Sequence, residues 1–223
     1  MVSKSLTREV AIVSSLASNS NDKSQGHSIS VVDPQNSVVL ASFKGNRSKA
    51  NSLALCGKDY IFSAQSFGTS IFIWSWGMEQ VKFKCPTKEK LCSLNTSSDG
   101  GFCICGGFSG KIYIWEIGSG TLIHSWDAHY KAVTVLTFSN DNCTIYSGSD
   151  DAMVSSWNLL NLLQKDSNIK TNLNGDIVTS KWTMNEHTLK ITSLSLDQTG
   201  SKIFSSSLDR TVKIVESLSG AVL

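Results

Sequence analysis

Short stretches in which apolar and polar residues alternate recur along most of the chain. Three of them end in tryptophan and are similar to one another: residues 70–74, 111–115 and 153–157. Alternation with a period of two is typical of β-strands that bury one face, whereas an amphipathic helix repeats every 3.6 residues. Turns rich in glycine, serine and aspartate separate the stretches. The pattern therefore predicts an all-β chain of short strands.

These stretches return at a nearly constant interval. A weaker copy at 28–33 precedes the three, and another at 211–215 follows them. The positions that close the copies are Val32, Trp74, Trp115, Trp157 and Val215. The steps between them are 42, 41, 42 and 58 residues, which predicts one four-stranded unit repeated about five times.

The last three units resolve into individual strands. We expect those of the third unit at 91–96, 101–106, 111–116 and 121–126, and those of the fourth at 132–138, 144–147, 152–157 and near 180–184. The strands of the fifth unit are expected at 191–196, 202–206 and 211–215. The longer step between the last two copies places an insertion at 159–178. Residues 158–164 suit one or two helical turns, and 165–178 suit a flexible loop. The four leucines at 159, 160, 162 and 163 either pack beneath the units or dock against a partner.

A polar constellation recurs in the fourth and fifth units. It comprises His129, Ser147, Asp151 and Trp157, and then His187, Ser205 and Asp209 at the same spacing, with Val215 where a second tryptophan would stand. Serine, histidine and aspartate together could form a hydrolase triad. The alternative is a structural network in which the polar groups satisfy one another. Two copies at one spacing, and the lack of a glycine-rich nucleophile elbow, favour the structural network.

Composition narrows the functional classes. A formal net charge of +2 gives no general reason to expect a polyanionic partner. The six cysteines include no CxxC pair and no histidine cluster at metal-ligand spacing, so we expect no cofactor and no metal. Cys103 and Cys105 share a strand face, either as a redox pair or as buried thiols, and buried thiols are the preferred interpretation. The N-terminus has no apolar leader and no stretch reaches transmembrane length, so we expect an intracellular protein in a reducing compartment, without membrane contact.

The repeat resembles the WD40 family over nearly the whole chain. The resemblance implies a β-propeller and a buried tetrad at His129, Ser147, Asp151 and Trp157, with a partial copy at His187, Ser205 and Asp209. A narrower resemblance, to the WD-repeat subunit of the Rix complex of pre-60S ribosome maturation, is carried by Cys85-Pro86 and by residues 91–94, 114–117, 129–130 and 156–160. It implies a nuclear protein with Rix-type subunits as partners.

WD40 propellers usually close with seven blades, whereas about five are expected here. We place blade 1 at 9–43, blade 2 at 50–85, blade 3 at 90–127, blade 4 at 129–186 and an incomplete blade 5 at 187–223. An open propeller leaves raw sheet edges. The expectation is therefore a fragment, a truncated product, or a propeller completed by another chain.

Two groups of residues are candidates for binding. Phe67, Phe108, Asp150 and Leu208 each precede the turn position that Asp151 occupies in blade 4, and project from the propeller's upper face. Exposed aromatic groups on a rigid rim favour partner contact, the alternative being that each ring folds back over its blade. Lys82, Lys84, Lys88 and Lys90 lie between blades 2 and 3. They could contact RNA, but a charged edge that discourages sheet pairing is preferred, and Lys82 and Lys84 are expected on one strand face.

The sequence thus predicts a non-catalytic protein-interaction scaffold in a nuclear complex for large ribosomal subunit assembly and pre-rRNA processing, with no small-molecule substrate. The alternative is a WD40 receptor for a substrate or a modified tail in a ubiquitin-ligase or chromatin complex. That function requires an arginine-lined or aromatic channel, and the scarcity of arginine argues against it.

Overall fold

The structure is a computed structural model that describes residues 10–14, 29–43, 48–57, 59–65, 68–163 and 178–223. Eighteen strands and one short helix occur in these residues. The strands form five separate antiparallel sheets, each a unit of the repeat. The prediction of an all-β, propeller-like chain of about five blades is confirmed.

Each sheet follows the chain from strand to strand. Blade 1 contains β1 (Ala11–Ser14), β2 (Ile29–Asp33) and β3 (Val38–Phe43), and blade 2 contains β4 (Ser48–Cys56), β5 (Tyr60–Gln65), β6 (Ser70–Ser75) and β7 (Phe83–Pro86). Blade 3 contains β8 (Leu91–Thr96), β9 (Phe102–Gly107), β10 (Lys111–Glu116) and β11 (Leu122–Asp127). Blade 4 contains β12 (Val133–Phe138), β13 (Thr144–Ser149), β14 (Val154–Asn158) and β15 (Trp182–Met184), with helix α1 (Leu159–Leu163) after β14. Blade 5 contains β16 (Ile191–Leu196), β17 (Lys202–Ser207) and β18 (Val212–Glu216), and a single bridge pairs Val215 with Val222.

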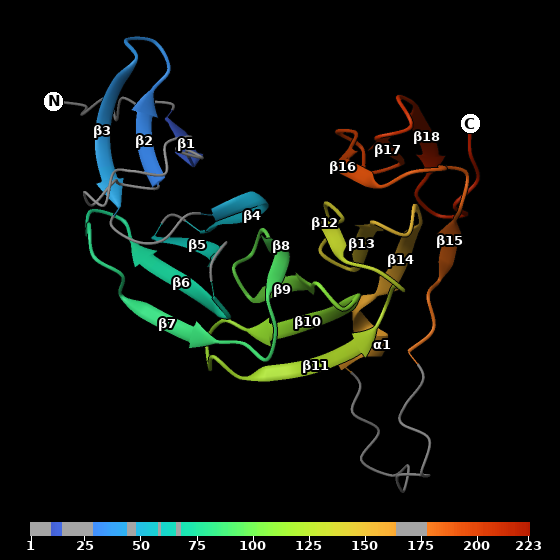
Figure 1. Cartoon of the computed structure of the whole chain (residues 1–223), viewed down its shortest axis with the longest axis horizontal. Helices are drawn as coiled ribbons and strands as arrows, with labels where there is room; N and C mark the ends of the chain where they lie inside the picture. The colour runs from blue at the N-terminus through green and yellow to red at the C-terminus, as the bar shows by residue number, and fades with distance from the viewer. Residues whose placement is uncertain (1–9, 15–28, 44–47, 58, 66–67, 164–177) are drawn as a thin grey trace, which may run out of the picture.

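The five blades follow one another around an open arc (Figure 1). The first strands β4, β8, β12 and β16 lie toward the middle of the arc, and β7, β11 and β15 lie at its outside. We call the side of the loops between second and third strands, and between one blade and the next, the upper face. The lower face carries the loops between first and second and between third and fourth strands.

Apolar side chains fill the spaces between successive blades. The cluster between blades 3 and 4 includes Ile112, Trp126, Leu136, Ile145 and Trp157, and similar clusters lie between the other pairs. Because each strand alternates its side chains between the two faces of its sheet, one blade contributes to the cluster on either side of it. Interblade packing therefore holds the arc together.

A bulge interrupts the first strand of several blades at the same place. In blades 4 and 5 the register skips Thr134 and Thr192. A bulge residue is unpaired in the ladder, which leaves its carbonyl oxygen available to other donors. The side-chain nitrogen of Asn51, on β4, lies 3.2 Å from the carbonyl oxygen of Thr134 and 2.9 Å from that of Thr192. Asn51 has a φ of 58°, a left-handed conformation that asparagine adopts more readily than most residues. Blade 2 thereby contacts blades 4 and 5 directly.

Candidate functional site

The polar constellation of blade 4 forms one continuous hydrogen-bonded network. The Nδ1 atom of His129 is 3.0 Å from Oδ2 of Asp151, and its Nε2 atom is 2.7 Å from the hydroxyl oxygen of Ser147. The same hydroxyl oxygen lies 2.8 Å from the indole nitrogen of Trp157. Asp151 also accepts the backbone N–H groups of Tyr130 and Met153. The network thus links the loop before β12 to the turn between β13 and β14.

The hydrogen-bond roles leave Ser147 little capacity for chemistry. A carboxylate only accepts, so a neutral His129 donates from Nδ1 to Asp151 and accepts the Ser147 hydroxyl proton at Nε2. The Ser147 oxygen in turn accepts the indole N–H of Trp157. Ser147 is fully buried, and the side chains of His129 and Asp151 are 1% and 6% exposed. A nucleophilic serine needs an exposed oxygen beside a base, and here that oxygen is enclosed.

The same network sets the charge state of Asp151. Burial by itself raises the pKa of this carboxyl group, but the hydrogen bond from His129, with those from the N–H groups of Met153 and Tyr130, outweighs it and lowers the pKa. Asp151 is therefore the ionised anchor of the network.

Blade 5 holds a shorter version of the network. Nδ1 of His187 is 2.9 Å from Asp209, and Nε2 is 2.9 Å from the hydroxyl oxygen of Ser205. The hydrogen bond from the Thr211 hydroxyl, together with that from His187, holds the pKa of Asp209 well below its ordinary value. Val215 is fully buried where Trp157 stands in blade 4, so this copy ends at Ser205 without an indole donor.

A hollow of ≈ 640 Å³ opens on the upper face beside the blade 4 network. His129 and Asp151 lie along its wall with Tyr130, Met153 and Trp157, and Ser147 is not among its lining residues. The side-chain nitrogen and carboxylate groups of His129, Asp151 and Trp157 on this wall are already hydrogen-bonded within the network, which is typical of a structural role.

Blade 3 contains a polar network that the sequence analysis did not identify. The tetrad positions are occupied there by other residue types, with Ser109 at the turn position that Asp151 occupies in blade 4. Instead, Glu89 accepts hydrogen bonds from the backbone N–H of Ser109 (2.8 Å), the Ser109 hydroxyl (2.7 Å) and the Tyr113 hydroxyl (2.7 Å). Burial opposes ionisation of Glu89, but these hydrogen bonds lower its pKa. Burial and Glu89 together raise the pKa of Tyr113.

Three of the four residues proposed for the upper face are described, and all three are exposed. Phe108 is 65% exposed and Leu208 58%, and Asp150 is also exposed. Phe67 lies outside the described residues. Tyr130, which was not among the candidates, is 88% exposed on the same face, because its N–H is held by Asp151 while its ring points outward. The sequence feature that could have identified Tyr130 is its position directly after His129, the histidine of the tetrad.

The four lysines between blades 2 and 3 are all exposed. The expectation that Lys82 and Lys84 share a strand face is wrong. The ammonium of Lys82 lies over the rings of Tyr60 and Phe83, at 5.0 and 5.5 Å from their centroids, whereas that of Lys84 lies over Phe72 on the opposite face, at 5.1 Å. Strand β7 begins only at Phe83, so the alternation does not extend to Lys82.

No disulfide joins any of the six cysteines, all of which lie within the described residues. The sulfur atoms of Cys103 and Cys105 lie 3.9 Å apart between blades 2 and 3, and burial raises the pKa of the Cys105 thiol. Cys105 is therefore a thiol in an apolar core rather than a reactive thiolate, and Cys103 is buried in the same core. Within the described ranges, no three histidine, cysteine, aspartate or glutamate residues are grouped as a metal site would require.

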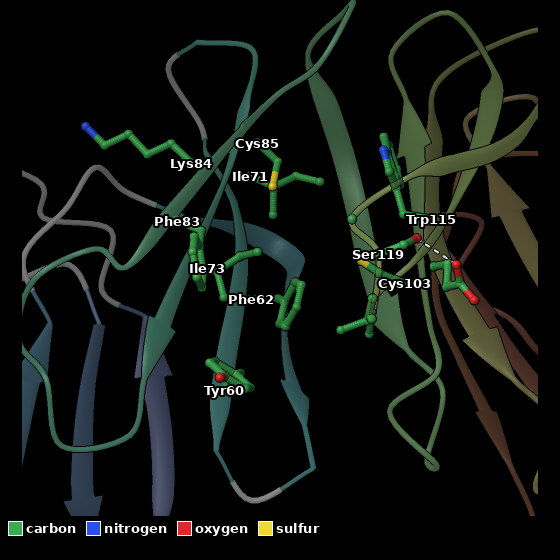
Figure 2. Close-up of a pocket in the computed structure, with 14 residues that line it drawn as sticks. Tyr60, Phe62, Ile71, Ile73, Phe83, Lys84, Cys85, Cys103, Trp115 and Ser119 are labelled. Atoms are coloured by element: carbon green, nitrogen blue, oxygen red, sulfur yellow. Dashed lines mark hydrogen bonds between the residues drawn. The ribbon is translucent and has the colours of Figure 1, made fainter.

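A second hollow, of ≈ 620 Å³, lies between the outer halves of blades 2 and 3 on the lower face. Figure 2 shows Phe62, Ile73 and Phe83 of blade 2 on one side of it and Trp115 and Ser119 of blade 3 on the other. We refer to it as the blade 2–3 groove. Its walls are predominantly apolar, with Glu116 and Lys84 as its charged lining residues.

Comparison with known proteins identifies the repeat. The family model for the WD domain, G-beta repeat, matches residues 78–116, 120–158 and 178–216. The chain belongs to the WD40-repeat family. The polar networks are consistent with that membership: the second matched segment contains the blade 4 tetrad, and the third contains the shorter network of blade 5.

This WD40 chain is similar in sequence to several named proteins, including a WD repeat-containing protein and a pre-rRNA-processing protein. It is 34% identical to Protein ROOT INITIATION DEFECTIVE 3 of Arabidopsis thaliana, over 77% of this chain and 40% of the relative. It is 31% identical to Pre-rRNA-processing protein IPI3 of Yarrowia lipolytica (75% and 37%) and 30% identical to WD repeat-containing protein 18 of Bos taurus (82% and 41%). The predicted resemblance to a subgroup of WD-repeat proteins of ribosome maturation is confirmed by the pre-rRNA-processing relative. The chain spans less than half the length of each of these relatives.

A solved structure shows the same fold. The computationally designed Ika8 protein superposes with a TM-score of 0.65 over 87% of this chain and 54% of its own, at 22% identity. In the described part of the WD40 chain, no helix has the length and apolar character needed to cross a membrane.

Proposed function

We propose that this chain acts as a non-catalytic protein-interaction scaffold in a nuclear complex for large ribosomal subunit assembly and pre-rRNA processing. The observation that carries the proposal is its 31% identity to Pre-rRNA-processing protein IPI3 across 75% of its length. A scaffold needs a rigid frame and exposed contact residues. The enclosed tetrads supply rigidity, and Phe108, Tyr130 and Leu208 supply exposed apolar groups on the upper face.

Affinity purification of the tagged chain from nuclei, followed by mass spectrometry and pre-rRNA blotting, tests this function. We expect large-subunit assembly factors, including the subunits of a Rix-type complex, and pre-rRNA species. Recovery of ubiquitin-ligase or chromatin subunits in their place would instead establish the substrate or tail receptor.

The upper face is the proposed contact surface for protein partners, with Phe108, Asp150 and Leu208 on it. Leu208→Asp and Phe108→Asp should each reduce recovery of the partners at least tenfold, since exposed apolar anchors dominate interface energies. Leu160→Asp is the matched control, because Leu160 is 59% exposed but lies on the lower face in α1. Equal losses in the control would contradict an upper-face contact.

The proposed absence of catalysis rests on the enclosed serines. A fluorophosphonate probe should label neither Ser147 nor Ser205 in the folded chain, because both are fully buried. If the probe labels Ser147 or Ser205 in the folded chain and the labelling is lost on heat unfolding, the chain would instead have hydrolase activity.

Direct RNA contact by Lys82, Lys84, Lys88 and Lys90 stays a weaker proposal. Two of these ammonium groups lie over aromatic rings of their own blade, which leaves less of their charge for phosphate. Filter binding of pre-rRNA fragments should show a salt dependence that is unchanged when all four are replaced by glutamine. A salt dependence that falls in this variant would establish the contact.

A further inference from the structure

The turn that borders the blade 2–3 groove and helix α1 occupy equivalent places in successive blades. The N–H of Ile117 donates to the carbonyl oxygen of Gly101, and the N–H of Leu159 donates to that of Cys143, both at 2.9 Å. Both residues directly follow the third strand of their blade. The chain then makes a tight turn through Gly118, Ser119 and Gly120 in blade 3, but forms α1 in blade 4.

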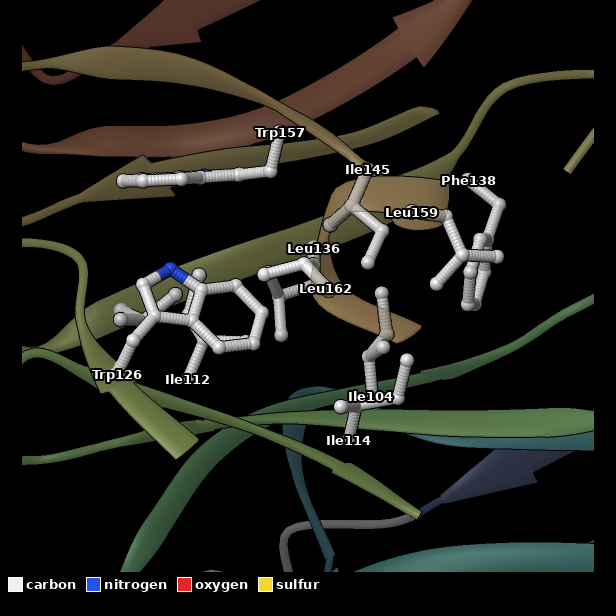
Figure 3. Close-up of a cluster of buried hydrophobic side chains, with 11 residues drawn as sticks. Ile104, Ile112, Ile114, Trp126, Leu136, Phe138, Ile145, Trp157, Leu159 and Leu162 are labelled. Atoms are coloured by element: carbon white, nitrogen blue, oxygen red, sulfur yellow. The ribbon is translucent and has the colours of Figure 1, made fainter. Parts of the chain in front are cut away.

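In blade 4 this position supplies apolar side chains to the interblade core. Leu159 and Leu162, on one face of α1, are 6% and 4% exposed and pack with residues of blade 3 and blade 4 (Figure 3). Residues three apart on a helix point to the same side, so a single turn delivers two leucine side chains between the blades. The blade 3–4 interface therefore contains its own apolar wedge.

In blade 3 the residues at the same position supply fewer apolar side chains to the interblade core. The turn offers Ile117, two glycines and Ser119, whose hydroxyl is bonded to Glu116. The groove of ≈ 620 Å³ lies at this point, within the size range of binding sites for small ligands and short anchors. Phe83 on its rim is 53% exposed, although it is a large apolar residue on a folded strand. The groove thus has the apolar walls of an interblade core, but fewer side chains occupy the space between them.

The charged side chains at the rim of the groove indicate which charged group a ligand would carry beside its apolar side chains. The ammonium of Lys82 lies over Tyr60 and Phe83, both of which line the groove, whereas the ammonium of Lys84 lies over Phe72, on the opposite face of the blade 2 sheet. Glu116 lies on the opposite wall, where its carboxylate accepts the Ser119 hydroxyl. The blade 2 wall therefore favours an acidic group on its ligand.

We propose that the blade 2–3 groove binds a short amphipathic helix of a partner protein. The helix presents two leucine-like side chains three positions apart, as α1 does between blades 3 and 4, with an acidic residue facing Lys82. This interaction goes beyond the scaffold function and does not depend on the complex being pre-ribosomal. It uses the lower face, and so leaves the upper face available to other partners.

The test uses a labelled synthetic 16-residue helical peptide with leucines at i and i+3 and three flanking glutamates. Fluorescence anisotropy should show saturable binding to the whole chain, and a scrambled peptide should not bind. Phe83→Glu should weaken binding at least tenfold, while Phe108→Glu, the same change at an exposed phenylalanine of the upper face, should leave it unchanged. Absence of binding, or equal losses in the two variants, would overturn the proposal.

Three further variants separate this occupant from others. Gly118→Leu places a leucine where a Cβ meets no atom within 4 Å, so it should fill the groove and abolish peptide binding without lowering the melting temperature. Gly118→Ser should retain binding. Lys82→Glu should weaken the acidic peptide about threefold and strengthen a peptide with lysines in place of its glutamates. If sedimentation shows self-association that Phe83→Glu abolishes, the occupant is a second copy of this chain and the assignment to a partner helix is wrong.

Discussion

The indole nitrogen of Trp157 lies 2.8 Å from the hydroxyl oxygen of Ser147, whereas Val215 at the matching position of blade 5 has nothing to donate to Ser205. Ser147→Ala therefore leaves two buried groups without a partner, and Ser205→Ala leaves one. At about 1–3 kcal/mol for each orphaned group, we expect Ser147→Ala to lower the free energy of unfolding about twice as much as Ser205→Ala. Urea unfolding of both variants measures this difference, and equal losses would contradict the role given to Trp157.

The lowered pKa of Asp151 makes its contribution to stability dependent on pH. A carboxyl group whose pKa is lower in the folded state stabilises the fold above its ordinary pKa of about 4, and the stabilisation is lost as pH falls through the folded value. The difference in unfolding free energy between the natural chain and Asp151→Asn should thus be constant from pH 7 to pH 5 and shrink below pH 4. A difference that grows on acidification would have the wrong sign for an ionised anchor.

Gly110 holds the turn of blade 3 against the loop that carries His129. Its φ is +95°, and a Cβ there would lie 2.0 Å from the carbonyl oxygen of His129. Gly57 has a similar positive φ, of +58°, but no atom lies within 4 Å of its Cβ position. Gly57→Ala should cost about 1–2 kcal/mol from backbone strain alone. Gly110→Ala should cost more, because the backbone of His129 must also move, and the melting temperatures of the two variants report the difference.

The Glu89 network of blade 3 can be tested by exchanging charges. Ser109 occupies the turn position that Asp151 occupies in blade 4, so Ser109→Asp places a second carboxylate against Glu89. We expect it to lower stability by about 2 kcal/mol, as like charges without a counterion repel in a partly buried site. Adding Glu89→Lys should recover most of that loss. A double-mutant cycle with no coupling between the two positions would show that Glu89 does not hold the turn.

Much of the strand arrangement followed from the sequence because its signals are local. The alternation at 91–96 and 111–116 gave both the existence and the bounds of β8 and β10. The second strands were placed one or two residues short at their ends: β13 extends to Ser149 and β17 to Ser207. Their last residues are small and polar, and tertiary packing rather than alternation keeps them in the ladder.

Features that depend on contacts between blades could not be obtained in this way. The apolar run at 159–163 left open whether the leucines pack or bind, and packing of Leu159 and Leu162 against blade 3 depends on the angle between two sheets. The sequence assigned no role to Glu89, because its partners Ser109 and Tyr113 are 20 and 24 positions away in the chain. The repeat spacing predicted where the tetrads lie, and it carried no information about a substitute network.

Asn51 alters how such a chain is expected to unfold. In a repeat protein whose modules contact only their neighbours, stability is a sum of nearest-neighbour terms, and the ends can fray independently. The amide of Asn51 links modules that are 83 and 141 positions apart in the chain. Unfolding of blade 5 would therefore lower the stability of blade 2 directly, even while the blades between them stay folded. The rates of hydrogen exchange in these two sheets should be correlated.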